Sequence, residues 1–473
     1  MSDSTLGPSP VRAARPPLTP LAAAWLLAML LGLQPLTTDL MLPALPALGA
    51  DLRAPVAPVQ MTMTALILAF GLAQLVWGPV ADRVGRRPVL LAGLALYVAA
   101  SVGAALAGDV AQVIGWRVVQ GAALSVPVVC ARAMLRDLYE PHEGALVMAR
   151  ALSGLGLVAI ASPLLGGLLV AIFGWRATLA TMGVLGAALW GWLAWRVPET
   201  LKQLDPQATR MKPLALQVGR ILAHPGFRAW ALLVACAYAG LFVFLSGSGY
   251  VLIRVLGLPP AQAGVVMATT SLAYITGTFI CRRWLPRHGL VGAVKRGSAF
   301  SIASVAGMAL LAWTDHRAVW AVMLPTWLYM LGHGVHQPCG QAGAVGPFPR
   351  SAGLAAAVAG GLLALATFAI GAWLGSALDG TLRPFAIGLA VGGSGVSLVV
   401  WTLVRRHGEP PRSTTDEGRA ERRAAPSRPA IPSGAEPGRG QSGGLSSPGE
   451  EPSRKDRRGP QGRRTYSSDE GST

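Results

Sequence analysis

Charged residues are scarce in this chain, and their scarcity excludes an ordinary soluble protein. They make up 13% of the 473 residues, whereas soluble domains average about 25%. Lysine is rarer still, so the formal charge of +18 comes from arginine. The basic residues stand in short clusters between apolar runs and in the C-terminal segment, which does not suit a nucleic-acid-binding surface. We therefore expect no nucleic-acid partner.

Cysteine pairs and phosphate-binding motifs are also missing. The four cysteines stand in apolar stretches without Cys-x-x-Cys spacing, so they predict neither a disulfide framework nor a zinc site and are interpreted as small core residues. No Gly-Lys dipeptide occurs, so a Gly-x-x-x-x-Gly-Lys loop is absent and an ATP-driven pump on one chain is excluded. No catalytic nucleophile constellation can be assembled from loop residues. We expect no enzyme, no metal site and no cofactor.

Long apolar runs are what the chain has in abundance. A bilayer core of ~30 Å needs about 20 mostly apolar helical residues, and lipid leaves the backbone no partner outside a helix. Twelve such runs are present, six before a polar stretch and six after it: 21–46, 57–80, 88–107, 111–135, 144–171, 174–196, 227–253, 260–282, 291–313, 318–340, 352–378 and 383–404. The sequence therefore predicts an all-α membrane protein with 12 transmembrane helices.

The distribution of basic residues in the short joins predicts the orientation of the chain. The joins on one side are rich in them: Arg83, Arg86 and Arg87 after the second run, Arg282, Arg283, Arg287, Lys295 and Arg296 after the eighth, and Lys202, Arg210, Lys212 and Arg220 in the central stretch. The connecting loops on the other side carry few basic residues. Since basic joins face the cytoplasm, an even number of spans places both termini inside. We expect a multi-pass protein of the bacterial inner membrane.

The polar stretches divide the chain into five segments. We expect a cytoplasmic N-terminal segment (1–19), a six-helix bundle (20–197), a cytoplasmic central loop (198–225), a second six-helix bundle (226–405) and a cytoplasmic tail (406–473). The tail consists mainly of Pro, Gly, Ser, Arg and Glu. Because such a segment cannot bury a core, it is expected to be disordered.

An ordered set of glycine, acid and arginine joins the second and third runs, in Gly78-Pro-Val-Ala-Asp82-Arg83-Val-Gly85-Arg86-Arg87. The glycines allow two helices to meet in a tight turn, and an acid at a helix end suits a helix N-terminus or a nearby arginine. A plain basic loop would not require this order. The segment resembles the loop signature of the major facilitator superfamily. The resemblance implies two pseudo-symmetric six-helix bundles, with this loop as a gate latch that joins the halves and steadies the outward-facing state.

Two ionisable residues lie inside apolar runs of the first half. Arg117, in Arg117-Val-Val-Gln120-Gly121, resembles the family's fourth-helix signature, and Asp39 lies in a stretch that resembles the first helix of the Bcr/CflA drug-resistance branch. An ionisable group within a span is costly and is a functional candidate by default. Burial disfavours a charged carboxylate and a nearby arginine favours it, so Asp39 beside Arg117 is expected to couple transport to protons. The alternative for Arg117 is that its side chain extends to the outer membrane interface. The alternative for Asp39 is that it is a cap at that interface.

Glycine and proline recur in the fifth run, in Ser162-Pro163-Leu-Leu-Gly166-Gly167. The stretch resembles the antiporter signature, with Ser162 in place of a glycine. The resemblance implies that Pro163, Gly166 and Gly167 allow a bend and close helix packing. The end of the eighth run echoes the first loop signature at the matching place, which supports duplicated halves.

Polar and aromatic residues of the spans are candidates to line a substrate cavity. In the tenth run, His333 and His336 share a helix face, but a metal would need further ligands that the second half does not offer. We expect His336 or Gln337 to contact substrate, with plain packing as the alternative. The candidates are Gln34, Thr38, Gln120, Phe244, Tyr250, His336 and Gln337.

Transport driven by an ion gradient is the function that these observations leave. We expect a monomer in the lipid bilayer that exports small drug-like molecules in exchange for protons, by alternating access about a midplane site. Acids within the membrane are few, so neutral or amphipathic compounds suit it, and the resemblance implies antibiotics of the amphenicol or bicyclomycin kind. The alternatives are a metabolite exporter or uptake permease on the same fold, or a membrane-embedded enzyme or sensor.

Overall fold

The structure, a computed structural model, describes residues 19–139, 141–201, 203–206 and 208–409. The predicted N-terminal segment up to residue 18 and the predicted tail from residue 410 lie outside the described residues. Helices make up nearly all of the described part, and no strand occurs in it.

The helices form two groups along the chain. The first half comprises α1 (Pro20–Asp39), η1 (Leu42–Ala44), α2 (Leu45–Asp51), α3 (Val56–Val84), α4 (Arg86–Ala105), α5 (Val110–Leu138), α6 (Pro141–Phe173) and α7 (Trp175–Arg196). A separate helix, α8 (Met211–Ala223), follows. The second half comprises α9 (Pro225–Gly249), η2 (Tyr250–Val255), α10 (Pro260–Thr314), α11 (Val319–Val345), η3 (Pro349–Ser351), α12 (Ala352–Ala377), α13 (Arg383–Val399), η4 (Val400–Val404) and α14 (Arg405–His407).

The number of membrane crossings follows from these helices. Nine helices of the described chain are long and apolar enough to cross a membrane. One of them, α10, holds two crossings, because Gly289 at φ 61° interrupts its 55 residues. The 33-residue α6 and the 27-residue α11 add two more. The part of the chain that the structure describes therefore supplies twelve helical segments long enough to cross a membrane, and the predicted all-helical fold class is confirmed.

The first crossing differs from the single helix predicted over 21–46. α1 ends at Asp39, and Pro43 and Pro46 then stand in the first turns of η1 and α2. Proline is tolerated there because the N–H that it lacks has no helical partner in a first turn. The chain continues in helical turns to Asp51, which pairs with Arg176. Asp39 therefore lies at a break inside the crossing and not at its outer end.

The central stretch, predicted as a loop, contains α8. Leu214, Val218 and Ile221 recur at helical spacing, and Ile221 is buried against the second half. The helix has too few apolar residues for a membrane run, which is why the search for spans missed it. The predicted bounds of the two bundles stay a prediction.

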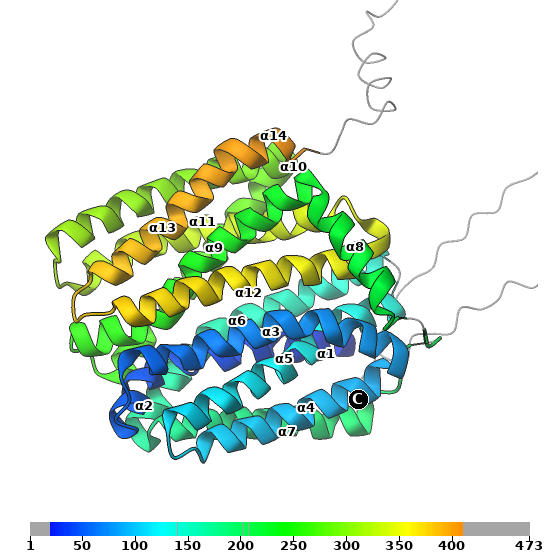
Figure 1. Cartoon of the computed structure of the whole chain (residues 1–473), viewed down its shortest axis with the longest axis horizontal. Coiled ribbons are helices and arrows are strands. Elements are labelled where there is room, and N and C mark those ends of the chain that lie inside the picture. Colours follow the sequence, from blue (N-terminus) through cyan, green and yellow to red (C-terminus); the bar gives the residue numbers. More distant parts are fainter. Residues whose placement is uncertain (1–18, 140, 202, 207, 410–473) are drawn as a thin grey trace, which may run out of the picture. The chain divides into compact units, whose positions relative to one another are not determined.

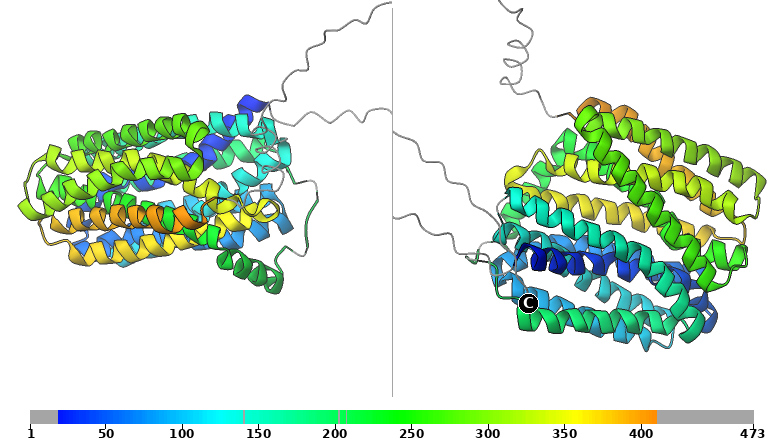
Figure 2. Two further views of the ribbon diagram at one scale, coloured as in Figure 1. Left: turned by 90° about the horizontal axis from the view of Figure 1, so that it is seen from above. Right: turned by 180° about the vertical axis from the view of Figure 1, so that it is seen from behind.

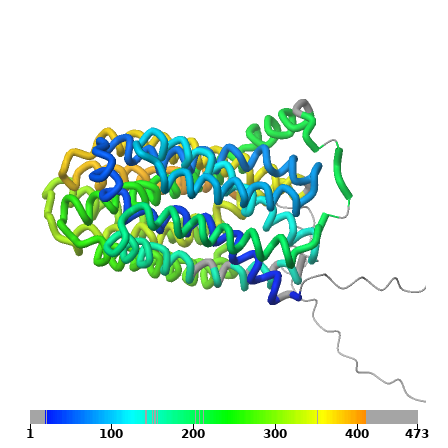
Figure 3. Tube along the Cα trace, turned by 90° about the horizontal axis from the view of Figure 1, so that it is seen from below, coloured from blue at the N-terminus to red at the C-terminus, as the bar shows by residue number. Residues whose placement is uncertain are grey.

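The long helices lie side by side, with the first half in the lower part of Figure 1 and the second half in the upper part. α8 lies at one end of the helices and α2 at the other, as Figures 1 and 3 show. The turn between α3 and α4 lies at the α8 end, since α3 starts beside α2. We call these the loop end and the α2 end.

The buried core joins the halves unequally. One apolar cluster extends from Leu30 and Leu66 in the first half to Phe242 and Phe385 in the second. The buried members of a second cluster, such as Trp230, belong only to α8 and the second half, and lie toward the loop end. Among the described residues, the halves therefore share a core toward the α2 end and are more separate at the loop end.

Candidate functional site

The two halves meet through close helix crossings. Gly167 of α6 packs on α10, where a Cβ would come within 3.3 Å of the Cα of Gly264, and a Cβ on Gly264 would strike the carbonyl oxygen of Pro163. Gly166 faces the backbone of Leu40, just past α1. The three residues predicted from the antiporter signature thus form the crossing of α6 with α1 and α10, which lie together in Figure 2.

Further contacts close the α2 end. The Ser246 hydroxyl donates to the side chain of Gln60, a buried hydrogen bond between α9 and α3. Arg254 donates to the carbonyl oxygen of Pro46 at 3.1 Å. Gly249 lies against the backbone of Leu42. These bonds join the start of the second half to the first crossing.

A polar and aromatic group lies where α1 faces the second half, about midway along the helices. Tyr238 of α9 lies close enough to Gln34 and Asp39 of α1 to interact with both. The His333 ring of α11 lies 6.2 Å from the ring of Tyr238 and 5.7 Å from that of Tyr274. All but His333 keep part of their surface accessible. We call Gln34, Asp39, Tyr238, Tyr274 and His333 the interface cluster.

A second polar group lies inside the first half. Arg117 is fully buried, and its guanidinium donates to Gln120 Oε1 at 2.7 Å and lies 3.0 Å from Met63 Sδ. Gln120 donates to the Ser101 hydroxyl at 2.7 Å, and Tyr97 shares a 2.7 Å hydrogen bond with the Thr37 hydroxyl. We call Thr37, Tyr97, Ser101, Arg117 and Gln120 the Arg117 cluster.

The predicted pairing of Asp39 with Arg117 is not formed in this structure. The ion pairs among the described residues involve neither residue. The reason is the geometry of α1, in which residues two apart point about 200° apart around the axis. Thr37 faces Arg117, with its carbonyl oxygen 3.5 Å from the guanidinium, whereas Asp39 faces α9 and accepts from Thr38 at 2.8 Å. Arg117 does not reach an outer interface either, since it has no exposed surface.

The loop between α3 and α4 is held by charges and by a distant carboxylate. Arg86 bonds Asp82 at 2.6 Å and Asp137 of α5 at 3.2 Å. The Glu199 carboxylate, beyond α7, accepts from the backbone N–H groups of Arg86 and Arg87, each at 3.0 Å, and so caps α4. Gly85 turns the chain at φ 113°, which favours glycine.

The arginines of this loop do not join the two halves. Arg87 donates to the carbonyl oxygens of Val197 and Ala194 at the end of α7, at 2.8 and 2.7 Å. Arg83 donates to Thr209 in the central stretch at 2.8 Å. The expected latch is thus tied within the first half and to the segment after α7. At this end, the guanidinium of Arg136 in α5 instead approaches Gly353 of α12.

The remaining predicted cavity residues are spread over several places. Phe244 is buried in the shared core, and Tyr250 is partly exposed in η2. His336 is buried within the second half, with Nε2 3.3 Å from the carbonyl oxygen of Val294, which matches the packing alternative. Gln337 Oε1 is buried without a hydrogen-bond partner among the described residues. Thr38 lies beside Asp39.

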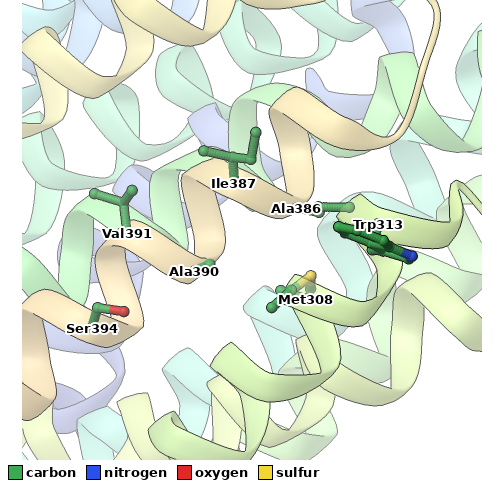
Figure 4. A pocket seen from close by; sticks show the side chains of 9 residues that line it. Met308, Trp313, Ala386, Ile387, Ala390, Val391 and Ser394 are labelled. Atoms are coloured by element: carbon green, nitrogen blue, oxygen red, sulfur yellow. The ribbon is translucent and has the colours of Figure 1, made fainter.

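A hollow in the second half lies away from these clusters. It measures about 530 Å³ and is lined by α10 and α13, including Met308, Trp313 and Val391 (Figure 4). Trp313 is 85% exposed and Val391 56%, so this apolar hollow lies on an outer face of the second half. In a membrane it would face lipid, which does not suit a transport site.

Sequence reasoning missed five residues of these groups: Thr37, Tyr97, Ser101, Tyr238 and Tyr274. Tyr97 and Ser101 are polar residues four apart in an apolar run, a spacing that places them on one helix face. That signal was available. The two tyrosines of the second half carry no comparable spacing, and only packing brings them to α1.

Comparison with known proteins adds a family. The sequence profile of the Major Facilitator Superfamily matches residues 27–369.

Curated proteins of similar sequence include several resistance proteins. The chain is 30% identical over 339 residues to the multidrug resistance protein D of Escherichia coli (strain K12), covering 71% of this chain and 84% of that protein. It is 31% identical over 329 residues to a chloramphenicol resistance protein of Pseudomonas aeruginosa, covering 68% and 75%. A bicyclomycin resistance protein homolog of Haemophilus influenzae is 26% identical over 353 residues, covering 74% and 87%.

Solved structures of similar fold include a D-xylose–proton symporter, with a TM-score of 0.63 and 16% identity over 81% of this chain and 98% of that one. A bacterial homolog of the human lysosomal transporter Spinster, in an inward-facing and unoccupied conformation, has a TM-score of 0.63 and 15% identity over 83% and 99%. At these identities the likeness concerns the fold alone.

Proposed function

The chain belongs to the Major Facilitator Superfamily, a family of secondary transporters and not of enzymes, and we propose that it exports small drug-like molecules across the bacterial inner membrane in exchange for protons. The resistance proteins at 26–31% identity support export as the direction. The distribution of basic residues supports a cytoplasmic loop end, cytoplasmic termini and a periplasmic α2 end.

The position of Asp39 carries the proposal. Every other acid of the described chain lies at a helix end or in a connecting segment, whereas Asp39 lies at the break inside the first crossing. It is partly exposed and lies near Tyr238 of the second half, close enough to interact electrostatically. A carboxylate within a membrane crossing is costly and needs a function. Proton carriage is the function that its chemistry allows.

In the proposed cycle, substrate enters from the loop end, where the halves share little buried core, and binds at the interface cluster. The halves then rock, and the contacts of the α2 end open toward the periplasm. Asp39 takes a proton from that side as the substrate leaves, and releases it to the cytoplasm after the α2 end closes again. Arg117 supports α1 through the Thr37 carbonyl oxygen and thereby positions Asp39 without pairing with it.

The cluster also indicates the class of substrate. It offers one carboxylate, an amide and three aromatic rings. Aromatic rings pack against other rings and apolar surface, and one carboxylate cannot balance two positive charges. Neutral or singly charged amphipathic molecules therefore fit, and the names of the relatives favour amphenicol- and bicyclomycin-like antibiotics. We propose that the transporter acts as a monomer.

Drug transport into inverted membrane vesicles energised with a proton gradient tests the role of Asp39. Asp39→Asn keeps the size of the side chain but cannot carry a proton, so gradient-driven transport should fall to the level of vesicles that lack the protein. Asp39→Glu, the matched control, should keep part of the activity. Undiminished transport by Asp39→Asn would exclude Asp39 as the proton carrier.

An uptake permease or metabolite exporter is the second candidate, since the fold is shared with a proton symporter. A drug susceptibility panel on cells with and without the gene separates the two. A gene that lowers susceptibility to at least one amphipathic antibiotic supports drug export, and a gene that changes only growth on a nutrient supports the alternative.

A further inference from the structure

The two halves treat their loop-end arginines differently. In the first half, Arg86 is 5% exposed and bonded to two carboxylates, and Arg87 is bonded to backbone carbonyl oxygens. The second half carries exposed arginines at the corresponding turn around Gly289 and at the last helix. We call these residues the basic patch: Arg282, Arg283, Arg287, Arg296, Arg405 and Arg406.

No ion pair among the described residues involves a member of the basic patch. The hydrogen bond that the structure gives them is internal, from Arg296 to the Gly292 carbonyl oxygen at 3.2 Å. The Arg282 guanidinium lies 5.5 Å from the centre of the Phe279 ring. In the first-half loop, Arg86 is thus buried, Arg87 is partly buried and the exposed Arg83 donates to Thr209, whereas the arginines of the patch are all exposed.

Packing brings the members of the patch together from segments far apart in the chain. The Trp401 indole of η4 donates to the Ser298 hydroxyl of α10 at 3.1 Å. About two turns further on, a Cβ at Gly408 would lie 3.0 Å from Val291, just past the Gly289 kink. α14 therefore ends beside the kink of α10, as their neighbouring labels in Figure 1 indicate.

Apolar surface adjoins the patch on its membrane side. Phe279 is 61% exposed and Trp401 50%, and each precedes exposed arginines by about one turn of helix, whereas Leu285, 38% exposed, lies between Arg283 and Arg287. Aromatic side chains at this level favour the boundary between acyl chains and headgroups. Cationic groups next to such a boundary meet lipid phosphates.

We propose that the basic patch binds the headgroups of anionic phospholipids, with Phe279 and Trp401 against the acyl chains. Guanidinium groups suit this partner because they bond phosphate oxygens bidentately and remain charged at every physiological pH. The lipid would supply negative charges to arginines that form no ion pair among the described residues. It would bridge α10 and α14 across the kink at Gly289.

Native mass spectrometry of the full-length protein tests the proposal, with dioleoyl phosphatidylglycerol and dioleoyl phosphatidylethanolamine as probes. The wild type should bind phosphatidylglycerol more tightly. Arg282→Gln/Arg287→Gln/Arg406→Gln should weaken that binding roughly a hundredfold, given about 1 kcal/mol per arginine near the surface. The control Arg150→Gln/Arg196→Gln/Arg220→Gln removes the same charge from exposed positions outside the second half and should change it little.

Three outcomes would overturn the proposal: equal affinity of the wild type for the two lipids, equal loss in both triple variants, or displacement of the lipid by millimolar inorganic phosphate, which would make the patch a site for free phosphate. All substituted side chains are exposed, and the triple lysine variant, which keeps the charge, should retain the preference. Because the readout is lipid binding, failure here leaves the transport proposal untouched.

Discussion

Arg117 is a buried charge that neutral groups hold. Its short bond to Gln120 and its contacts with the carbonyl oxygens of Thr37 and Thr62 take the place of a counter-ion. A buried charge without polar partners is strongly destabilising, so the surrounding dipoles determine whether this arrangement is stable. Gln120, itself held by Ser101, is the most important of them.

Substitution of Gln120 should therefore lower the free energy of unfolding more than substitution of its neighbour Tyr97. Gln120→Leu removes a bond to a charged donor, worth about 1.5–3 kcal/mol, while Tyr97→Phe removes a neutral bond worth about 1 kcal/mol. Thermal unfolding in detergent measures both, and the melting temperature of Gln120→Leu should be the lower. Equal melting temperatures would contradict the assigned role of Gln120.

At the scale of elements, the loop end of the first half depends on residues outside its own signature. Glu199 caps α4 from the segment after α7, while Arg87 caps the end of α7 from the start of α4. The two helices are thereby tied at neighbouring ends. The loop signature acts through this reciprocal contact as well as through the ion pairs of Arg86.

Removal of the Glu199 cap should disturb transport, whereas removal of an ordinary cap should not. Glu199→Ala and Asp109→Ala each lose a helix cap, which costs about 1 kcal/mol, but Asp109 caps only its own helix α5. We expect a similar drop in melting temperature for both variants and lower drug transport in vesicles for Glu199→Ala alone. Normal transport by Glu199→Ala would mean that the tie between α4 and α7 has no role in the cycle.

The crossing of α6 with α10 gives a second test at this scale. Gly264→Val places a branched side chain against the Pro163 carbonyl oxygen, so the α2 end should fail to close and transport should fall severalfold or more. Gly191→Val makes the same change in α7, where nothing lies within 4 Å, and the helix-propensity cost is the same. Vesicle transport measures both, and equal activities would show that the crossing tolerates separation.

At the scale of the whole molecule, the buried core that the halves share lies toward the α2 end, while α3 and α12 also contact each other farther along, at Gln74 and Gly360. Gln60 and Ser246 bond across that boundary. Within the second half, by contrast, the thiols of Cys281 and Cys339 lie 3.4 Å apart. The Gln60–Ser246 pair spans the boundary between the halves, which must open during the proposed cycle. The Cys281–Cys339 pair does not.

Cross-linking distinguishes these pairs. Gln60→Cys/Ser246→Cys, in a chain whose native cysteines are replaced by alanine, should form a disulfide under copper phenanthroline and stop transport, and dithiothreitol should restore it. In the wild type, oxidation of Cys281 and Cys339 should leave transport nearly unchanged. Transport that continues with the 60–246 bond formed would exclude opening of the α2 end at this boundary.

The sequence by itself determined the fold class and identified the candidate functional residues. The number of crossings was readable because lipid allows only helices of a set length. Asp39 and Arg117 were visible because an ionisable residue in an apolar run is costly. The glycines of the fifth run were singled out by a signature, and the structure places them in a backbone crossing.

Only the tertiary structure decided the partners. Asp39 faces Tyr238 and Arg117 contacts Gln120, because the direction of a side chain depends on where its helix breaks and how it is rotated against its neighbours. Glu199 caps a helix that begins far earlier in the chain, which no local pattern records. The basic clusters of the two halves look alike in sequence. In the structure, Arg86 of the first is buried and paired with Asp82 and Asp137, whereas the arginines of the second are exposed and form no ion pair among the described residues.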